Sequence, residues 1–132
     1  MSYLHLIFGI LLFVVFAITG RFMRSDFPDK LEMDQALRVL MRSRHIYILF
    51  SSLIHLTLGV YMQMRPGVLQ RVIQLTGSAL LIASSLLLVW AFAVETYGTR
   101  AFTDLSRYGI YTALAGVVLH LLGGFGGRKP SV

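Results

Sequence analysis

The stretch RHIYILFSSLIHLTLGVYMQMRP, residues 44–66, decides the fold. It is an apolar run bounded by arginines, and as a helix it is long enough to cross the roughly 30 Å hydrocarbon core of a bilayer. One histidine, His55, lies deep inside it. Three further apolar runs of similar length occur along the chain. The sequence therefore predicts membrane-spanning helices at about 3–22, 46–64, 72–94 and 108–125.

The composition agrees with a membrane protein. The 132 residues are 56% hydrophobic and 14% charged, whereas soluble domains carry about 25% charged residues. We expect a single all-α domain, 1–132, folded as an up-down-up-down bundle of four transmembrane helices. The chain has no cysteine, which excludes disulfides, thiolate nucleophiles, iron–sulfur clusters and cysteine zinc sites.

The net charge of +6 raises the question of nucleic-acid binding. The Lys and Arg residues flank the apolar runs and form no stripe with aromatic residues, so the lipid bilayer is the expected partner and nucleic acid is not. Eight of the twelve lie on the side that holds the two long connections. Positive charge favours the cytoplasmic side, which predicts an inner-membrane protein with both termini on the outer, periplasmic side.

The first connection, the predicted cytoplasmic loop 23–45, is the longest polar piece. Pro28 and Asp29 are typical of a helix start. Apolar residues then recur at helical spacing: Met33, Ala36, Leu37, Leu40 and Met41. Segment 31–41 is expected to form a short interfacial amphipathic helix that contacts lipid or protein. The alternative, that this segment simply leads into the second span, is the interpretation that we favour.

Two of the predicted spans share a pattern of small residues around a histidine. The two sets are Ser51, His55 and Gly59, and Gly116, His120 and Gly124. Four residues advance a helix by about 400°, so each set occupies one stripe roughly 80° wide. Counting from the nearest outer arginine, His55 and His120 are expected at similar depth.

One interpretation of this pattern is a b-type haem with His55 and His120 as axial ligands. In a square bundle the second and fourth helices are diagonal, roughly 13 Å apart, which suits two imidazoles with iron between them. Ser51, Gly59, Gly116 and Gly124 would leave room for the porphyrin. The extended signatures of four-helix membrane cytochromes are absent from the sequence. A metal site that adds His5 to these histidines is a weaker alternative.

The structural interpretation uses the same residues without a cofactor. Small residues at four-residue spacing let membrane helices approach closely, and a neutral histidine can hydrogen-bond across helices. For His55 the expected partners are a backbone carbonyl or Ser84. Glu95, the acidic residue that a transporter would use, is expected to pair with Arg44 or Arg107.

These observations favour a non-enzymatic role, as an accessory or interaction subunit that binds another membrane protein or a second copy of itself. The first alternative is a bis-histidine haem protein that passes electrons to quinone or a redox partner. The second is a small oligomeric transporter.

Overall fold

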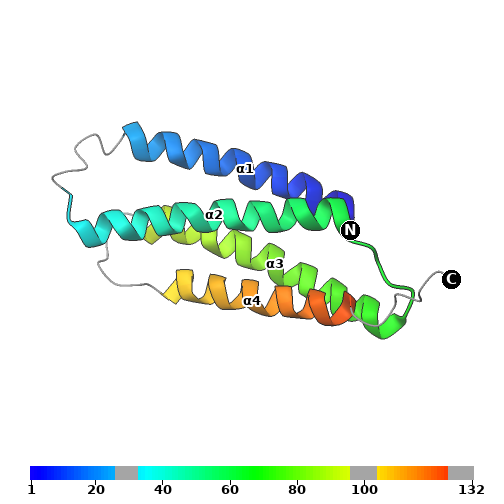
Figure 1. The fold of residues 1–132 in the computed structure, drawn as a ribbon. Helices are drawn as coiled ribbons and strands as arrows, with labels where there is room; N and C mark the ends of the chain where they lie inside the picture. The colour runs from blue at the N-terminus through cyan, green and yellow to red at the C-terminus, as the bar shows by residue number, and fades with distance from the viewer. Residues whose placement is uncertain (26–32, 96–103, 125–132) are drawn as a thin grey trace.

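The computed structural model describes residues 1–25, 33–95 and 104–124, and over these ranges the chain forms four α-helices (Figure 1). They are α1 (Ser2–Ser25), α2 (Gln35–Tyr61), α3 (Val68–Glu95) and α4 (Asp104–Gly124). Strands are absent from these described ranges. The all-helical fold predicted from the sequence is therefore confirmed.

Three of the four helices, α1, α3 and α4, are long and apolar enough to cross a membrane. α2 is also long, with 27 residues, but it is not among the three. Its first half carries Arg38, Arg42 and Arg44. At about 1.5 Å per residue, its apolar part, residues 46–61, is roughly 24 Å long. The length and composition of three helices thus indicate a membrane protein, and α2 is the most polar of the four helices.

The first connection is shorter than the predicted loop 23–45. α1 continues to Ser25, and α2 begins at Gln35, where the side chain of Asp34 caps the helix by accepting a hydrogen bond from the backbone N–H of Ala36 (2.9 Å). The prediction of a separate interfacial helix within 31–41 is wrong, because residues 35–41, which the structure describes, are the first turns of α2. The alternative, a direct lead into the second span, is what the structure has. The expected start at Pro28 and Asp29 lies outside the described residues.

The other boundaries differ by a few residues. α2 ends at Tyr61, before the predicted Met64, and the backbone N–H of Met62 closes the last turn on the carbonyl of Leu58 (2.9 Å). α3 begins at Val68 where Val72 was predicted. α4 begins at Asp104 and is described as far as Gly124.

The helices are arranged as two antiparallel hairpins, α1 with α2 and α3 with α4 (Figure 1). His5, near the start of α1, contacts His55, near the end of α2, and Thr19, near the end of α1, contacts His45 near the start of α2. The contact between α2 and α3 is much thinner. α1 therefore begins, and α4 ends, at the same end of the bundle (Figure 1).

Glycines set the close approach within each hairpin. A Cβ on Gly59 would lie 2.7 Å from the Cα of Leu6, and a Cβ on Gly9 would lie 2.8 Å from the backbone N of Leu56. In the other hairpin, a Cβ on Gly77 would lie 2.9 Å from the carbonyl oxygen of Gly116. No side chain fits at these positions without moving a neighbouring backbone, so the missing Cβ is what allows the backbones to touch.

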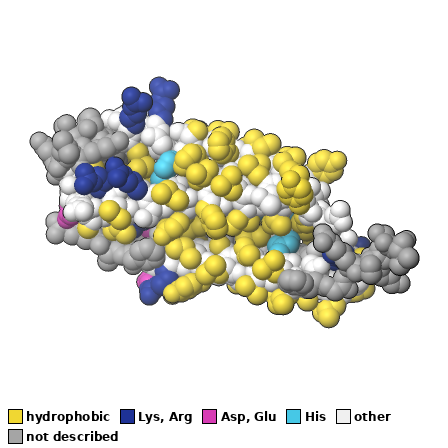
Figure 2. Space-filling view, viewed as in Figure 1, with side chains coloured by type: hydrophobic (Ala, Val, Ile, Leu, Met, Phe, Trp, Pro, Cys, Tyr) yellow, Lys and Arg dark blue, Asp and Glu magenta, His cyan; other side chains and the backbone are white. Residues whose placement is uncertain are grey.

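The exterior of the bundle is more apolar than that of a soluble protein. Large apolar side chains cover the outside of the helices, as the visible face in Figure 2 shows, and basic residues gather at the end where α1 ends and α2 begins. The buried polar set is dominated by small hydroxyls: Ser51, Ser52, Ser78, Ser84, Ser85 and Ser106. An apolar exterior around a hydrogen-bonded interior is what a hydrocarbon solvent requires.

Candidate functional site: a buried histidine–serine network

Three histidines and two serines form one hydrogen-bonded network between the two hairpins. Nδ1 of His5 lies 2.7 Å from Nδ1 of His55, and Nε2 of His5 lies 2.9 Å from the hydroxyl of Ser78. The same hydroxyl lies 3.0 Å from Nε2 of His120. At the other end, Nε2 of His55 lies 3.0 Å from the hydroxyl of Ser85. All four helices therefore contribute to a single polar line through the bundle.

A backbone carbonyl determines the direction of the hydrogen bonds at one end. The hydroxyl of Ser85 donates to the carbonyl of Leu81 (2.9 Å), so it must accept from Nε2–H of His55. A neutral imidazole, the form that an apolar interior favours, has one N–H and one lone-pair nitrogen. Nδ1 of His55 is then the acceptor, and Nδ1–H of His5 is the donor.

The same reasoning carries through to the last ring. With its proton on Nδ1, His5 accepts at Nε2, so the hydroxyl of Ser78 donates to it. That hydroxyl has then used its one hydrogen, and it accepts from Nε2–H of His120. The remaining nitrogen of His120, Nδ1, is left as a lone-pair acceptor. One carbonyl thus sets the tautomer of all three histidines.

The three rings differ in burial. His5 and His55 are fully buried, and their rings meet through the two Nδ1 atoms with centroids 4.9 Å apart and planes 24° apart. His120 is half-buried, and it lines a groove of about 770 Å³ between α2 and α4. The network therefore has a closed end inside the bundle and an end that reaches a cavity.

The structure places the two predicted haem ligands in one network but not face to face. His5 and Ser78 lie between His55 and His120 in the line of hydrogen bonds. His5, the weak candidate, is the central member. Both nitrogens of His55 are already bonded, to His5 and to Ser85, so this arrangement gives no support to iron between His55 and His120. The ranges that the structure describes also contain no group of three metal-binding side chains arranged to hold an ion.

The small residues assigned to porphyrin clearance have other surroundings. Gly59 lies against Leu6, and a Cβ on Gly116 would lie 2.8 Å from Cγ of Leu81. Ser51 is buried, whereas a Cβ on Gly124 would meet nothing within 4 Å. Two of the four thus serve close helix packing, which favours the structural interpretation. The expected bond from His55 to Ser84 is wrong, because Ser84 donates to the carbonyl of Gly109 (2.7 Å) and Ser85 takes its place.

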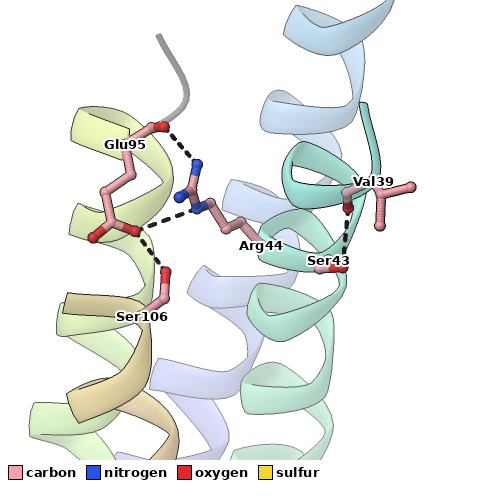
Figure 3. Close-up of polar contacts among 5 residues, drawn as sticks. All are labelled: Val39, Ser43, Arg44, Glu95 and Ser106. Carbon is pink, nitrogen blue, oxygen red and sulfur yellow. Dashed lines mark hydrogen bonds and ion pairs between the residues drawn. The ribbon is translucent and has the colours of Figure 1, made fainter. Parts of the chain in front are cut away.

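A second polar cluster lies at the other end of α2 (Figure 3). Nε of Arg44 lies 3.3 Å from Oε2 of Glu95, and Nη1 of Arg44 donates to the backbone carbonyl of Glu95. The hydroxyl of Ser106 donates to the same carboxylate oxygen (2.6 Å). Of the two partners predicted for Glu95, the structure has Arg44, while Arg107 pairs with Asp104 on the surface.

Sequence reasoning gave no role to Ser78 and Ser85 of α3. Ser78 and Ser85 are seven residues apart, which is two helical turns and therefore one face of α3. That spacing was available in the sequence, but small hydroxyls are common in membrane helices and mark close packing as often as a polar network.

Comparisons with protein-family models, with curated proteins and with solved structures find no match to this chain.

Proposed function

We propose that this chain is a small integral inner-membrane protein that acts as a non-catalytic accessory or interaction subunit. The observation that carries the proposal is the internal pairing of the two fully buried histidines, His5 and His55, which are hydrogen-bonded to each other and to serines of the bundle. Glu95, the acidic residue that the transport hypothesis needs, is bonded to Arg44 and Ser106. Such an interior stabilises one arrangement of helices and leaves the outer apolar surface for lipid and a protein partner.

In this proposal α2 is the fourth span. Its apolar part is only a little shorter than the hydrocarbon core, and the polar side chains that lower its hydropathy are turned inward, as His55, Ser51 and Ser52 are buried. Arg44, at the start of this part, is neutralised by Glu95. A helix whose buried histidine and serine are hydrogen-bonded inside the bundle, as His55 and Ser52 are, can cross beside more apolar neighbours.

Both termini are proposed to lie on the outer side, from the excess of Lys and Arg on the side of the two long connections. The start of α1 and the end of α4 share one end of the bundle, which supports a common side (Figure 1). Since the chain has no cysteine, single cysteines report sidedness directly. In intact cells, Ser2→Cys should react with a membrane-impermeant maleimide and Gln35→Cys should not. The opposite pattern would overturn the orientation.

The interaction role is tested with photo-crosslinking residues in native membranes. α1 and α4 each pack mainly on one neighbour, so their outward faces are the candidate docking surfaces. The probes replace Ile7, Leu11 or Ile18 on α1, and Leu114, Val118 or Leu122 on α4, all of them exposed apolar positions. A specific partner should give one protein adduct of defined mass from one of the two helices, and tagging that partner should recover this chain.

The helix that gives no protein adduct provides the control, because probes that contact only lipid should give the same result on α1 and on α4. Adducts from neither helix, together with a monomer when the chain is extracted in native lipid discs, would refute an accessory or interaction role.

A further inference from the structure

The groove between α2 and α4 lies beside the open end of the histidine–serine network. Ile54 and Leu58 of α2 and Val117 and Leu121 of α4 form apolar walls, and His120 also lines the groove. Its volume of about 770 Å³ falls within the roughly 300–1,000 Å³ typical of small-molecule sites. The lining also includes polar residues, namely Thr57, Tyr61, Gln63, Arg65 and Gln74. Apolar walls with a few polar groups are suited to a ring compound that is dissolved in the membrane.

The ring of His120 has a fixed orientation in this groove. Nε2 is bonded to Ser78, and a Cβ on Gly77 would lie 3.0 Å from Cδ2 of His120, so the Cδ2–Nε2 edge faces α3. Nδ1 is on the opposite edge of the ring. It has no hydrogen-bond partner among residues 1–25, 33–95 and 104–124. The hydrogen-bond directions set by Leu81 make this nitrogen an acceptor.

An acceptor nitrogen at the side of an apolar groove selects the chemistry of the occupant. A phospholipid acyl chain offers no donor, and a phosphate would place negative charge against a lone pair. The carbonyl oxygen of a quinone is itself an acceptor, so it cannot form a hydrogen bond with the lone pair of Nδ1. A hydroxyl on an apolar ring can donate to Nδ1 while the walls cover the ring.

The mouth of the groove carries a cation, Arg65, whose side chain makes one hydrogen bond to the end of α4. Nη2 of Arg65 donates to the carbonyl of Gly124 (3.1 Å), and the backbone N–H of Arg65 donates to Gln74 (3.1 Å). These bonds hold the short 62–67 connection against the end of α4. Gly124 is four residues beyond His120, so Nδ1 lies only about 6 Å below the end of the described helix. A ring at this depth can reach His120 while its tail extends into the bilayer.

We propose that this groove binds a lipid-soluble hydroquinone, with one ring hydroxyl donating a hydrogen bond to Nδ1 of His120. Nδ1 of His120 distinguishes the reduced ring from the oxidised one, because only the hydroquinone has a proton to donate to this nitrogen. This inference goes beyond the proposed accessory role and does not depend on a protein partner.

The test uses the full chain in lipid nanodiscs and two matched ligands, a decyl-substituted benzohydroquinone and the corresponding benzoquinone. Equilibrium binding is measured for each under conditions that hold the redox state. The hydroquinone should bind about tenfold more tightly, the ratio that corresponds to one hydrogen bond of about 1.4 kcal/mol. A decylphenol and its methyl ether form a second pair that differs in the donor alone, and the phenol should be preferred.

Two variants assign the preference to His120. His120→Phe keeps an aromatic ring but removes the acceptor, and it should bind both members of each pair equally. Ser78→Ala frees Nε2, which lets His120 carry its proton on Nδ1 and should shift the preference toward the quinone. Val118→Ala, on the outward face of α4, is the control and should retain the wild-type ratio.

Equal affinity of the wild-type chain for both members of each pair would overturn the proposal, as would binding of neither, the result expected if the groove holds only acyl chains. A preference that persists in His120→Phe would place the donor elsewhere and would also overturn it. The matched ligands on the wild-type chain decide the question even if a variant fails to fold.

Discussion

Arg44 and Glu95 form a buried ion pair between α2 and α3, with Nε of Arg44 3.3 Å from Oε2 of Glu95 (Figure 3). The pair lies eleven residues from His55, roughly 16 Å along α2. The two hairpins are therefore joined by polar bonds at two levels, the ion pair near one end and the histidine–serine network near the other. Within each hairpin, by contrast, glycines bring the helices into backbone contact.

Removing one member of the ion pair should destabilise the bundle strongly. Glu95→Gln or Arg44→Met leaves the partner buried and unpaired, which typically costs about 3–5 kcal/mol. The double variant should recover part of this loss, since neither charge then remains. The measurement is the unfolding free energy in mild detergent, arranged as a double-mutant cycle. The surface pair of Arg107 and Asp104 is the control, and Arg107→Ala should leave stability unchanged. Additive effects of the two buried substitutions would show that the pair contributes nothing as a pair.

A methyl group at Gly59 should push α1 away from α2. The added Cβ would lie 2.7 Å from the backbone of Leu6, and relief requires a helix shift that we expect to cost about 1–3 kcal/mol. Gly124→Ala is the matched control, because a Cβ there meets nothing within 4 Å, and its effect should stay within about 0.5 kcal/mol. Thermal unfolding of the two variants in the same detergent compares them. Equal melting temperatures would contradict the role of Gly59 in helix packing.

The hydrogen-bond directions predict a definite set of histidine tautomers. ¹⁵N NMR of the imidazole nitrogens should show His5 protonated on Nδ1, and His55 and His120 on Nε2. Ser85→Ala removes the hydroxyl that fixes His55 and should change the ring signals of His55 and His5. Ser52→Ala is the control, since Ser52 is equally buried but bonds the carbonyl of Gly9 (2.9 Å). A His55 protonated on Nδ1 in the wild type would refute the assignment.

The haem hypothesis is decided by a visible spectrum. Iron between His55 and His120 would require the 2.7 Å contact of His5 with His55 to open and Ser78 to move aside. We therefore expect the protein, purified from haem-replete cells, to show no haem band in its reduced-minus-oxidised spectrum. A sharp band that His55→Ala and His120→Ala each abolish would overturn this expectation.

The long apolar runs of the sequence predicted the helices well, because a helix that faces lipid has a nearly continuous run of apolar residues. The sequence pattern located His55 and His120 on inward faces of their helices. It did not predict which helices would pair, because spacing along one helix says nothing about the neighbour that each glycine meets. The assumption of a square bundle placed α2 and α4 diagonally, with His55 and His120 facing each other. In the structure, His5 of α1 and Ser78 of α3 lie between these two histidines.

The residues that lead into α2 are a second feature that the sequence pattern did not decide on its own. Segment 31–41 has apolar residues at helical spacing with polar and charged residues between them, a pattern shared by interfacial helices and by the exposed first turns of a longer helix. The two differ in whether the helix continues past this segment. Asp34 starts a helix that continues without a break to Tyr61, so the pattern belongs to the start of the second span.

The thin junction between the hairpins has a consequence for assembly. Each hairpin forms its own backbone contacts, and the short 62–67 connection ties the two together. A gene divided there should yield two fragments that insert independently and then reassociate inside the bilayer. Complementation of this kind would depend on the polar bonds between the hairpins, which join His5 to Ser78, His55 to Ser85 and Arg44 to Glu95. Fragments carrying Ser78→Ala, Ser85→Ala and Glu95→Gln should therefore reassociate much less than the wild-type fragments.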